Sequence, residues 1–155
     1  NGGLPEGGEP PRAFVMWRAF ARWSPIFPIG KIINAGTVRN LSDSEIAAYN
    51  APFPDRRYTV AARVFPSFVP FENDVAIPDQ KRAWQVFDQW EKPFLCCFSD
   101  KDPVTRNGEP RFIGRIPGTA GQPHRTLSGG HFIQEDDPQG FVEAILAIAP
   151  KAIVK

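Results

Sequence analysis

The sequence contains the stretch Pro93-Phe94-Leu95-Cys96-Cys97-Phe98-Ser99-Asp100-Lys101-Asp102-Pro103, an apolar run that ends in two aspartates. A short continuous apolar run is typical of a strand buried on both faces of a parallel sheet. Downstream, Ser128-Gly129-Gly130-His131-Phe132 places a histidine in a glycine-rich turn. A carboxylate after a buried strand, followed later by such a histidine, predicts the acid–base half of a catalytic relay.

Composition limits the classes of protein that fit. The chain has 155 residues, of which 42% are hydrophobic and 23% charged, enough for one modest domain with a core. The formal net charge is +1 and the basic residues are scattered, so we expect no nucleic-acid partner. The longest apolar runs are shorter than a membrane span, so we expect no membrane association and a cytoplasmic location.

The first part of the chain predicts short helices and no strands. Proline and aromatic residues punctuate it, and Ser42 with Glu45 matches a capping box at the start of one helix. We interpret residues 1–72 as a helical cap, or lid, that needs another surface to cover. The predicted helices run from Pro11 to Ser24, from Ser42 to Asn50 and from Tyr58 to Val64.

The second part, residues 73–155, alternates between helices and strands. Such alternation predicts the edge of a parallel α/β sheet, so the expected fold class is α/β. The predicted elements are a helix at Pro78–Trp90, a strand at Pro93–Phe98, a helix at Pro110–Ile116, a strand at Arg125–Leu127 and a helix at Pro138–Ile148.

Functional groups in a parallel sheet collect at the carboxyl ends of its strands. Asp100, Asp102 and His131 all follow predicted strands, and 131 − 102 = 29 residues leave room for one crossover helix. We favour Asp102 as the partner of His131, because Pro103 holds it extended, and expect Asp100 to cap the turn. His124 precedes its strand, and we predict a surface position for it. The alternative is that Asp102 is an ordinary turn residue and His131 a structural one.

An aromatic pair on the first helix has two interpretations. Phe14 and Trp17 recur at helical spacing, which ordinary packing explains. An indole N–H, however, donates a hydrogen bond and accepts none, so a buried Trp17 also suits an anion or a halogen.

Three stretches together resemble the haloalkane dehalogenases of the α/β-hydrolase superfamily. They are Ala47-Ala48-Tyr49-Asn50-Ala51-Pro52-Phe53-Pro54-Asp55, Arg63-Val64-Phe65-Pro66 and Gly130-His131-Phe132-Ile133-Gln134-Glu135. The resemblance implies the cap and C-terminal portion of an α/β-hydrolase fold. It also implies hydrolysis of a carbon–halogen bond through an alkyl-enzyme ester, giving an alcohol and a halide.

The resemblance also implies roles for particular residues. His131 would be the base that activates water, Asp102 its acidic partner and Trp17 the halide donor on the lid. The small halogenated substrate, the halide and water are the expected ligands, with no cofactor and no metal. The implied substrate pocket is lined by Phe14, Phe65, Pro66, Val69, Val104 and Phe132.

The sequence departs from the family pattern in lacking its nucleophile. The family's His-Gly-x-Asp-Trp-Gly-like elbow, which also carries a second halide donor, does not occur here, and neither does Gly-x-Ser-x-Gly. We therefore expect an N-terminal hydrolase portion, from the same gene or a second chain, to complete the enzyme. The alternatives are an epoxide hydrolase, for which Tyr49 and Tyr58 form no obvious pair of donors, and a non-catalytic remnant with a binding or regulatory role.

Overall fold

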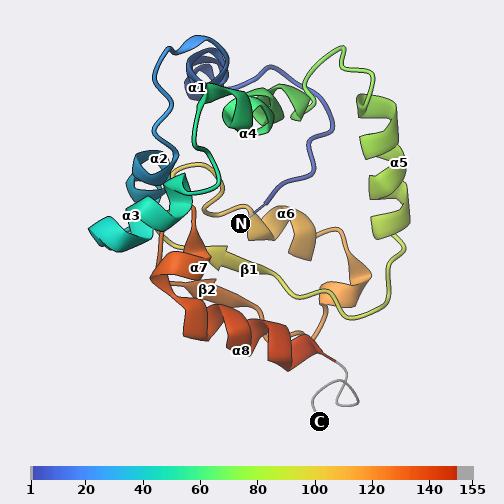
Figure 1. Ribbon diagram of the computed structural model, residues 1–155. Coiled ribbons are helices and arrows are strands. Elements are labelled where there is room, and N and C mark those ends of the chain that lie inside the picture. The colour runs from blue at the N-terminus through green and yellow to red at the C-terminus, as the bar shows by residue number, and fades with distance from the viewer. Residues whose placement is uncertain (1, 150–155) are drawn as a thin grey trace. The chain divides into compact units, whose positions relative to one another are not determined.

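The computed structural model describes residues 2–149, which form two compact units (Figure 1). The helical unit comprises Leu4–Asn34 and Leu41–Ala83. The sheet unit comprises residues 2–3, Ala35–Asn40 and residues 84–149. The segment Ala35–Asn40 therefore belongs to the sheet unit, although the chain on both sides of it belongs to the helical unit.

The helical unit contains short helices whose ends follow from local sequence. The predicted capping box of α3 is confirmed: the Ser42 hydroxyl accepts the Glu45 N–H at 3.3 Å, and the Glu45 carboxylate accepts the Ser42 N–H at 2.7 Å. Its helices are α1 (Arg12–Trp23), α2 (Ile29–Ala35, whose last residue belongs to the sheet unit), α3 (Asp43–Asn50), the 3₁₀ helix η1 (Arg56–Thr59), α4 (Val60–Val64), the 3₁₀ helix η2 (Phe65–Phe68) and the first part of α5 (Ile77–Phe87).

Helix α2, which the sequence pattern does not reveal, packs closely against α3. The Gly30 N–H donates to the Asn50 side chain at 2.9 Å. A Cβ added at Gly30 would lie 2.4 Å from the Ile46 carbonyl oxygen, so only glycine allows this approach. Arg63 is buried and joins α4 to the end of α1, because it donates to the carbonyl oxygens of Ala21 and Ser24.

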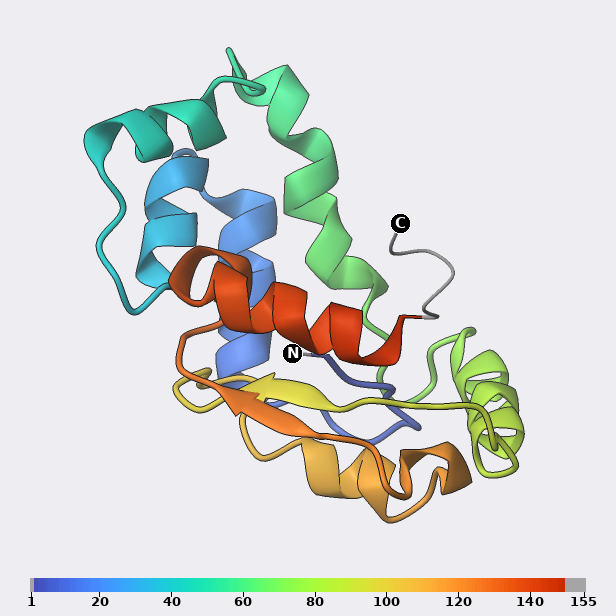
Figure 2. The same cartoon turned by 90° about the horizontal axis from the view of Figure 1, so that it is seen from below.

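The sheet unit contains a two-stranded parallel sheet, as the alternation of elements predicts. Figure 2 shows the two strands side by side, with α8 on one side of them and α6 on the other. Its elements are the end of α5, β1 (Cys97–Ser99), α6 (Glu109–Ile113), the 3₁₀ helix η3 (Pro117–Thr119), β2 (Arg125–Leu127), α7 (Ile133–Asp136) and α8 (Pro138–Ile148). The bounds of β2 and α8 match the prediction, whereas α7 was not predicted.

Strand β1 is shorter than predicted, because the residues before it bond to other groups. The Phe94 N–H donates to the Gly118 carbonyl oxygen at 2.9 Å. The Cys96 N–H donates to Nδ1 of His124 at 3.0 Å. Only Cys97–Ser99 pair with β2, so the apolar run approaches the sheet as extended chain and joins it at its last residues.

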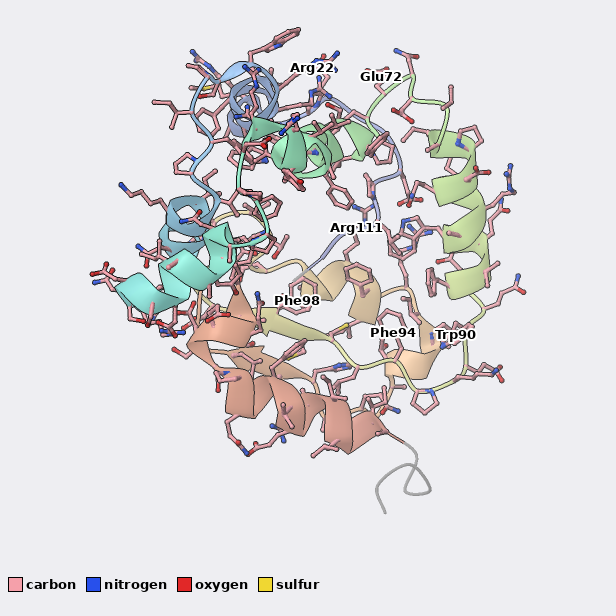
Figure 3. The ribbon with its side chains drawn as sticks, in the orientation of Figure 1. Arg22, Glu72, Trp90, Phe94, Phe98 and Arg111 are labelled. Atoms are coloured by element: carbon pink, nitrogen blue, oxygen red, sulfur yellow. The ribbon has the colours of Figure 1, made fainter. Side chains whose placement is uncertain are left out.

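Aromatic side chains fill the core of the sheet unit. Figure 3 shows Trp90, Phe94 and Phe98 following one another along the segment that leads into β1. The buried residue of α5 is Trp84. Its ring centroid lies 5.6 Å from that of Phe112 on α6, so α5 and α6 meet through aromatic contact.

Candidate active site

Asp102 lies two residues beyond Asp100, just past the end of β1, and its side chain is completely buried. The carboxylate accepts the Val104 N–H at 2.8 Å and the Thr105 hydroxyl. Burial by itself raises the pKa of the Asp102 carboxyl, but the hydrogen bonds from Thr105, Val104 and His131 outweigh it and hold this pKa below its ordinary value. Asp102 is thus a buried carboxylate with its charge stabilised by neighbouring donors.

His131 follows β2 and meets this carboxylate. Its Nδ1 lies 3.2 Å from Oδ1 and 3.1 Å from Oδ2 of Asp102. Because a carboxylate only accepts hydrogen bonds, Nδ1 carries the proton and Nε2 is the basic nitrogen. The His131 side chain is 42% exposed while the Asp102 side chain is 0% exposed. The imidazole is therefore accessible from outside, and the carboxylate that binds it is buried. This arrangement suits a general base.

The two aspartates after β1 have different partners, in line with the preference for Asp102 as the partner of His131. The Asp100 carboxylate accepts the Gly129 N–H at 2.9 Å and so joins the turns that follow the two strands. The Ser99 hydroxyl donates to the Gly130 carbonyl oxygen at 2.7 Å. Asp100 therefore shapes the turn that carries His131, and Asp102 contacts its ring.

The predicted surface position of His124 is wrong. Its side chain is partly buried, and Nδ1 accepts the Cys96 N–H while Nε2 lies 3.0 Å from the Thr119 carbonyl oxygen. Since Nδ1 accepts, Nε2 carries the proton and donates to Thr119. The ring thus accepts the N–H of the residue just before β1 and donates to Thr119, which gives His124 a structural role.

Two further residues of the predicted pocket lie beside the pair. Val104 is 69% exposed, and its main chain binds Asp102. The ring centroid of Phe132 lies 5.1 Å from that of His131, in an edge-on arrangement.

The other predicted residues lie in the helical unit. The Trp17 side chain is partly buried, with ring centroids 5.8 Å from Phe20 and 6.1 Å from Phe27. Its indole N–H makes no hydrogen bond to another residue within the described part of the chain. Phe14 contacts Phe71 at 5.2 Å between ring centroids. Phe65 is 71% exposed, Pro66 is buried and Val69 is partly exposed.

Sequence reasoning missed two residues that shape the site, Thr105 and Asp136. Thr105 lies three residues after Asp102, a spacing at which a hydroxyl reaches back to a carboxylate, so this contact was open to prediction. Asp136 binds backbone N–H groups from a distant segment, which no local pattern indicates.

Residues 2–149 contain neither a metal-binding cluster nor a membrane-spanning helix. No three His, Cys, Asp or Glu side chains lie close enough together to hold a metal ion. No helix in this range has both the length and the apolar character that crossing a bilayer requires.

No family model matches the chain. Among curated proteins, it is 47% identical over 149 residues to a haloalkane dehalogenase of Mycolicibacterium paratuberculosis, a match that covers 95% of this chain and 50% of that protein. It is also 47% identical over 125 residues to a haloalkane dehalogenase of Psychrobacter cryohalolentis, covering 79% of this chain and 41% of that one.

The solved structures agree with the sequence relatives. The haloalkane dehalogenase DpaA from Paraglaciecola agarilytica matches with a TM-score of 0.73 and 25% identity, covering 92% of this chain and 47% of that one. The fold is that of a C-terminal portion of an α/β hydrolase. The chain spans about half the length of the curated relatives it matches, and over nearly all of its own length it is a relative of the haloalkane dehalogenases.

Proposed function

We propose that this chain supplies the cap and the acid–base part of a haloalkane dehalogenase. The observation that carries the proposal is the contact between His131 Nδ1 and the buried Asp102 carboxylate, in a chain 47% identical to a haloalkane dehalogenase. In the proposed division, residues 1–72 form the cap and residues 73–155 the C-terminal part of the hydrolase core. The proposed location is the cytoplasm.

The proposed reaction has two steps. First, an aspartate carboxylate from the portion of the enzyme outside this chain attacks the halogen-bearing carbon, forming an alkyl ester and expelling halide. Second, His131 takes a proton from water, which adds to the ester carbonyl, and collapse of the adduct releases the alcohol and the carboxylate. The sum is haloalkane plus water giving alcohol, halide and a proton.

Asp102 and Trp17 support the two steps differently. When His131 gains its proton, the Asp102 carboxylate stabilises the imidazolium, and between turnovers it keeps the proton on Nδ1. The indole N–H of Trp17 is proposed to donate to the departing halide. Phe14, Phe65, Pro66, Val69, Val104 and Phe132 are proposed to surround the alkyl group.

The proposed partner is the nucleophile-bearing portion of the hydrolase. Within residues 2–149 β1 pairs with β2 alone, so one edge of β1 is open to a further strand. Pairing there would extend the sheet and bring a nucleophile to the carboxyl ends of the strands, where His131 lies.

The test is a fusion of this chain to the half of the Mycolicibacterium paratuberculosis relative that it does not match. Incubation with 1-bromobutane should release bromide continuously, detected with a halide-sensitive electrode. An epoxide hydrolase would instead open a simple epoxide and release no bromide, and a non-catalytic remnant would do neither. A folded fusion that releases no bromide would refute the proposal.

A further inference from the structure

The Asp136 carboxylate joins two segments that lie far apart in the sequence. Its Oδ1 accepts the N–H groups of Val38 and Arg39, each at 2.9 Å. Its Oδ2 accepts the Gly130 N–H at 2.7 Å. One side chain at the end of α7 therefore joins Gly130, the residue before His131, to a segment about 90 residues earlier in the chain.

The same early segment also binds the backbone of His131 directly. The Gly36 carbonyl oxygen accepts the His131 N–H at 2.7 Å and the Phe132 N–H at 3.3 Å. The Arg39 guanidinium donates to the Glu135 carbonyl oxygen at 2.6 Å and to the Glu135 carboxylate at 2.7 Å. We call residues 36–39 together with Asp136 the His131 support.

Gly130 shows how tightly the His131 support fits. A Cβ added to Gly130 would lie 2.4 Å from the Gly36 carbonyl oxygen, a distance at which backbone must move. From the sheet side, Ser99 holds the Gly130 carbonyl oxygen. Gly130, the residue before His131, is thus held at its carbonyl oxygen by Ser99 and at its N–H by Asp136, which also binds residues 38 and 39.

Contacts beyond the β1–β2 pairing hold the turn that carries His131, and the His131 support supplies part of them. Strand β2 ends at Leu127, four residues before the histidine, so the sheet hydrogen bonds do not set the direction of the ring. Burial by itself raises the pKa of the Asp136 carboxyl, but the N–H groups of Arg39, Gly130 and Val38 and the charge of Arg39 lower it below its ordinary value. Asp136 is therefore a carboxylate, the strongest acceptor available for these N–H groups.

We propose that Asp136 is a positioning residue for the catalytic base, and that residues 36–39 transmit its effect to the His131 turn. This inference rests on the proposed function, in which His131 activates the water that hydrolyses the ester. Asp136 itself touches neither His131's ring nor the reacting atoms. Its loss would displace the imidazole, and a displacement of about 1 Å costs about 100-fold in rate.

The experiment compares Asp136→Asn with Asp137→Asn in the fusion described above. The control removes a neighbouring carboxylate that accepts one backbone N–H, from Gly140 at 2.9 Å at the start of α8, outside the His131 support. Asp136→Asn should lower kcat about 100-fold with kcat/KM unchanged, because halide displacement precedes the impaired step. The alkyl-enzyme should accumulate and be visible by intact mass. Asp137→Asn should leave kcat unchanged.

A second readout does not need turnover. In ¹⁵N-labelled fusion protein, the His131 Nδ1–H proton bonded to Asp102 gives a downfield NMR signal, which should shift or broaden in Asp136→Asn and stay in Asp137→Asn. An unchanged kcat with an unchanged signal, or equal losses in both variants, would overturn the proposal. If the unaltered fusion releases no bromide, the proposed function is refuted. The Nδ1–H signal then still tests whether Asp136 positions His131. If Asp136→Asn does not fold, Asp136→Glu, which keeps the charge but moves the carboxylate by one methylene group, must lower kcat at constant kcat/KM.

Discussion

Replacing Asp102 with asparagine should stop ester hydrolysis while sparing halide displacement. The expected geometry follows from the donors around the carboxylate. The Val104 N–H faces Oδ1 and forbids an NH₂ group there, so the amide must place its NH₂ at the Oδ2 position. There it meets the Thr105 hydroxyl, which can rotate to accept. It also meets Nδ1 of His131 at 3.1 Å, slightly closer than the 3.2 Å from Nδ1 to the Oδ1 position, which favours an Nδ1 that accepts.

The consequence is a change of tautomer. With Nδ1 accepting, the imidazole proton moves to Nε2, which can no longer take a proton from water. The Asp-to-Asn change in a Ser-His-Asp triad costs about 10⁴ in kcat for this reason, and we expect a loss of about that size here. Loss of hydrogen bonds to a buried charged group should also cost about 1.5–3 kcal/mol of stability.

The assay is rapid mixing of the fusion with 1-bromobutane, followed by bromide detection and intact mass. Asp102→Asn should give a burst of about one bromide per enzyme molecule and then an alkyl-enzyme that persists. Asp100→Asn is the matched control, since it alters a carboxylate at the same strand end that binds only the Gly129 N–H among the contacts described. Steady turnover by Asp102→Asn, or an equal loss in Asp100→Asn, would refute the reasoning.

Further outcomes are expected. His131→Ala should also stop after one bromide per molecule, and turnover at the unaltered rate would remove His131 as the base. Trp17→Phe should weaken halide binding, read as saturable fluorescence quenching, by about ten- to hundredfold for the loss of one charge-assisted donor, while Trp23→Phe, at a 73% exposed position, should not. The folded pKa of Asp102 is lowered from 3.8, so its contribution to stability is complete above pH 3.8 and lost as the pH falls through the lower folded value. The difference in Tm between the unaltered fusion and Asp102→Asn should therefore shrink below about pH 4. The chain by itself should hydrolyse no bromoalkane, because it offers no nucleophile, and measurable bromide release from it alone would contradict this.

Local signals in the sequence predict most of the α-helices and the bounds of β2. The Ser42 capping box, the bounds of β2 and the bounds of α8 depend on residues within a few positions of one another, and they match the structure. The meeting of Asp102 and His131 was also predictable, because parallel strands of consecutive order end at the same edge of a sheet.

Contacts between distant segments were not predictable in this way. The length of β1 depends on His124 and Gly118, which take the N–H groups of the apolar run before a second strand can. The contacts of Asp136 involve residues 36–39, which carry no apolar periodicity from which an element could be predicted. A hydrogen bond spanning about 100 residues leaves no trace in spacing or composition, because either partner alone resembles an ordinary turn residue.

The chain path through Ala35–Asn40 bears on the engineering of chimeric enzymes. Suppose that the proposed cap, residues 1–72, is exchanged between two relatives. Residues 36–39 of the recipient would then be replaced together with its cap helices. The incoming cap would then supply a foreign loop beneath the recipient's histidine, opposite an Asp136 selected for another backbone. Junctions placed at residues 34 and 41, with 35–40 kept from the recipient, would separate changes in substrate range from damage to the base.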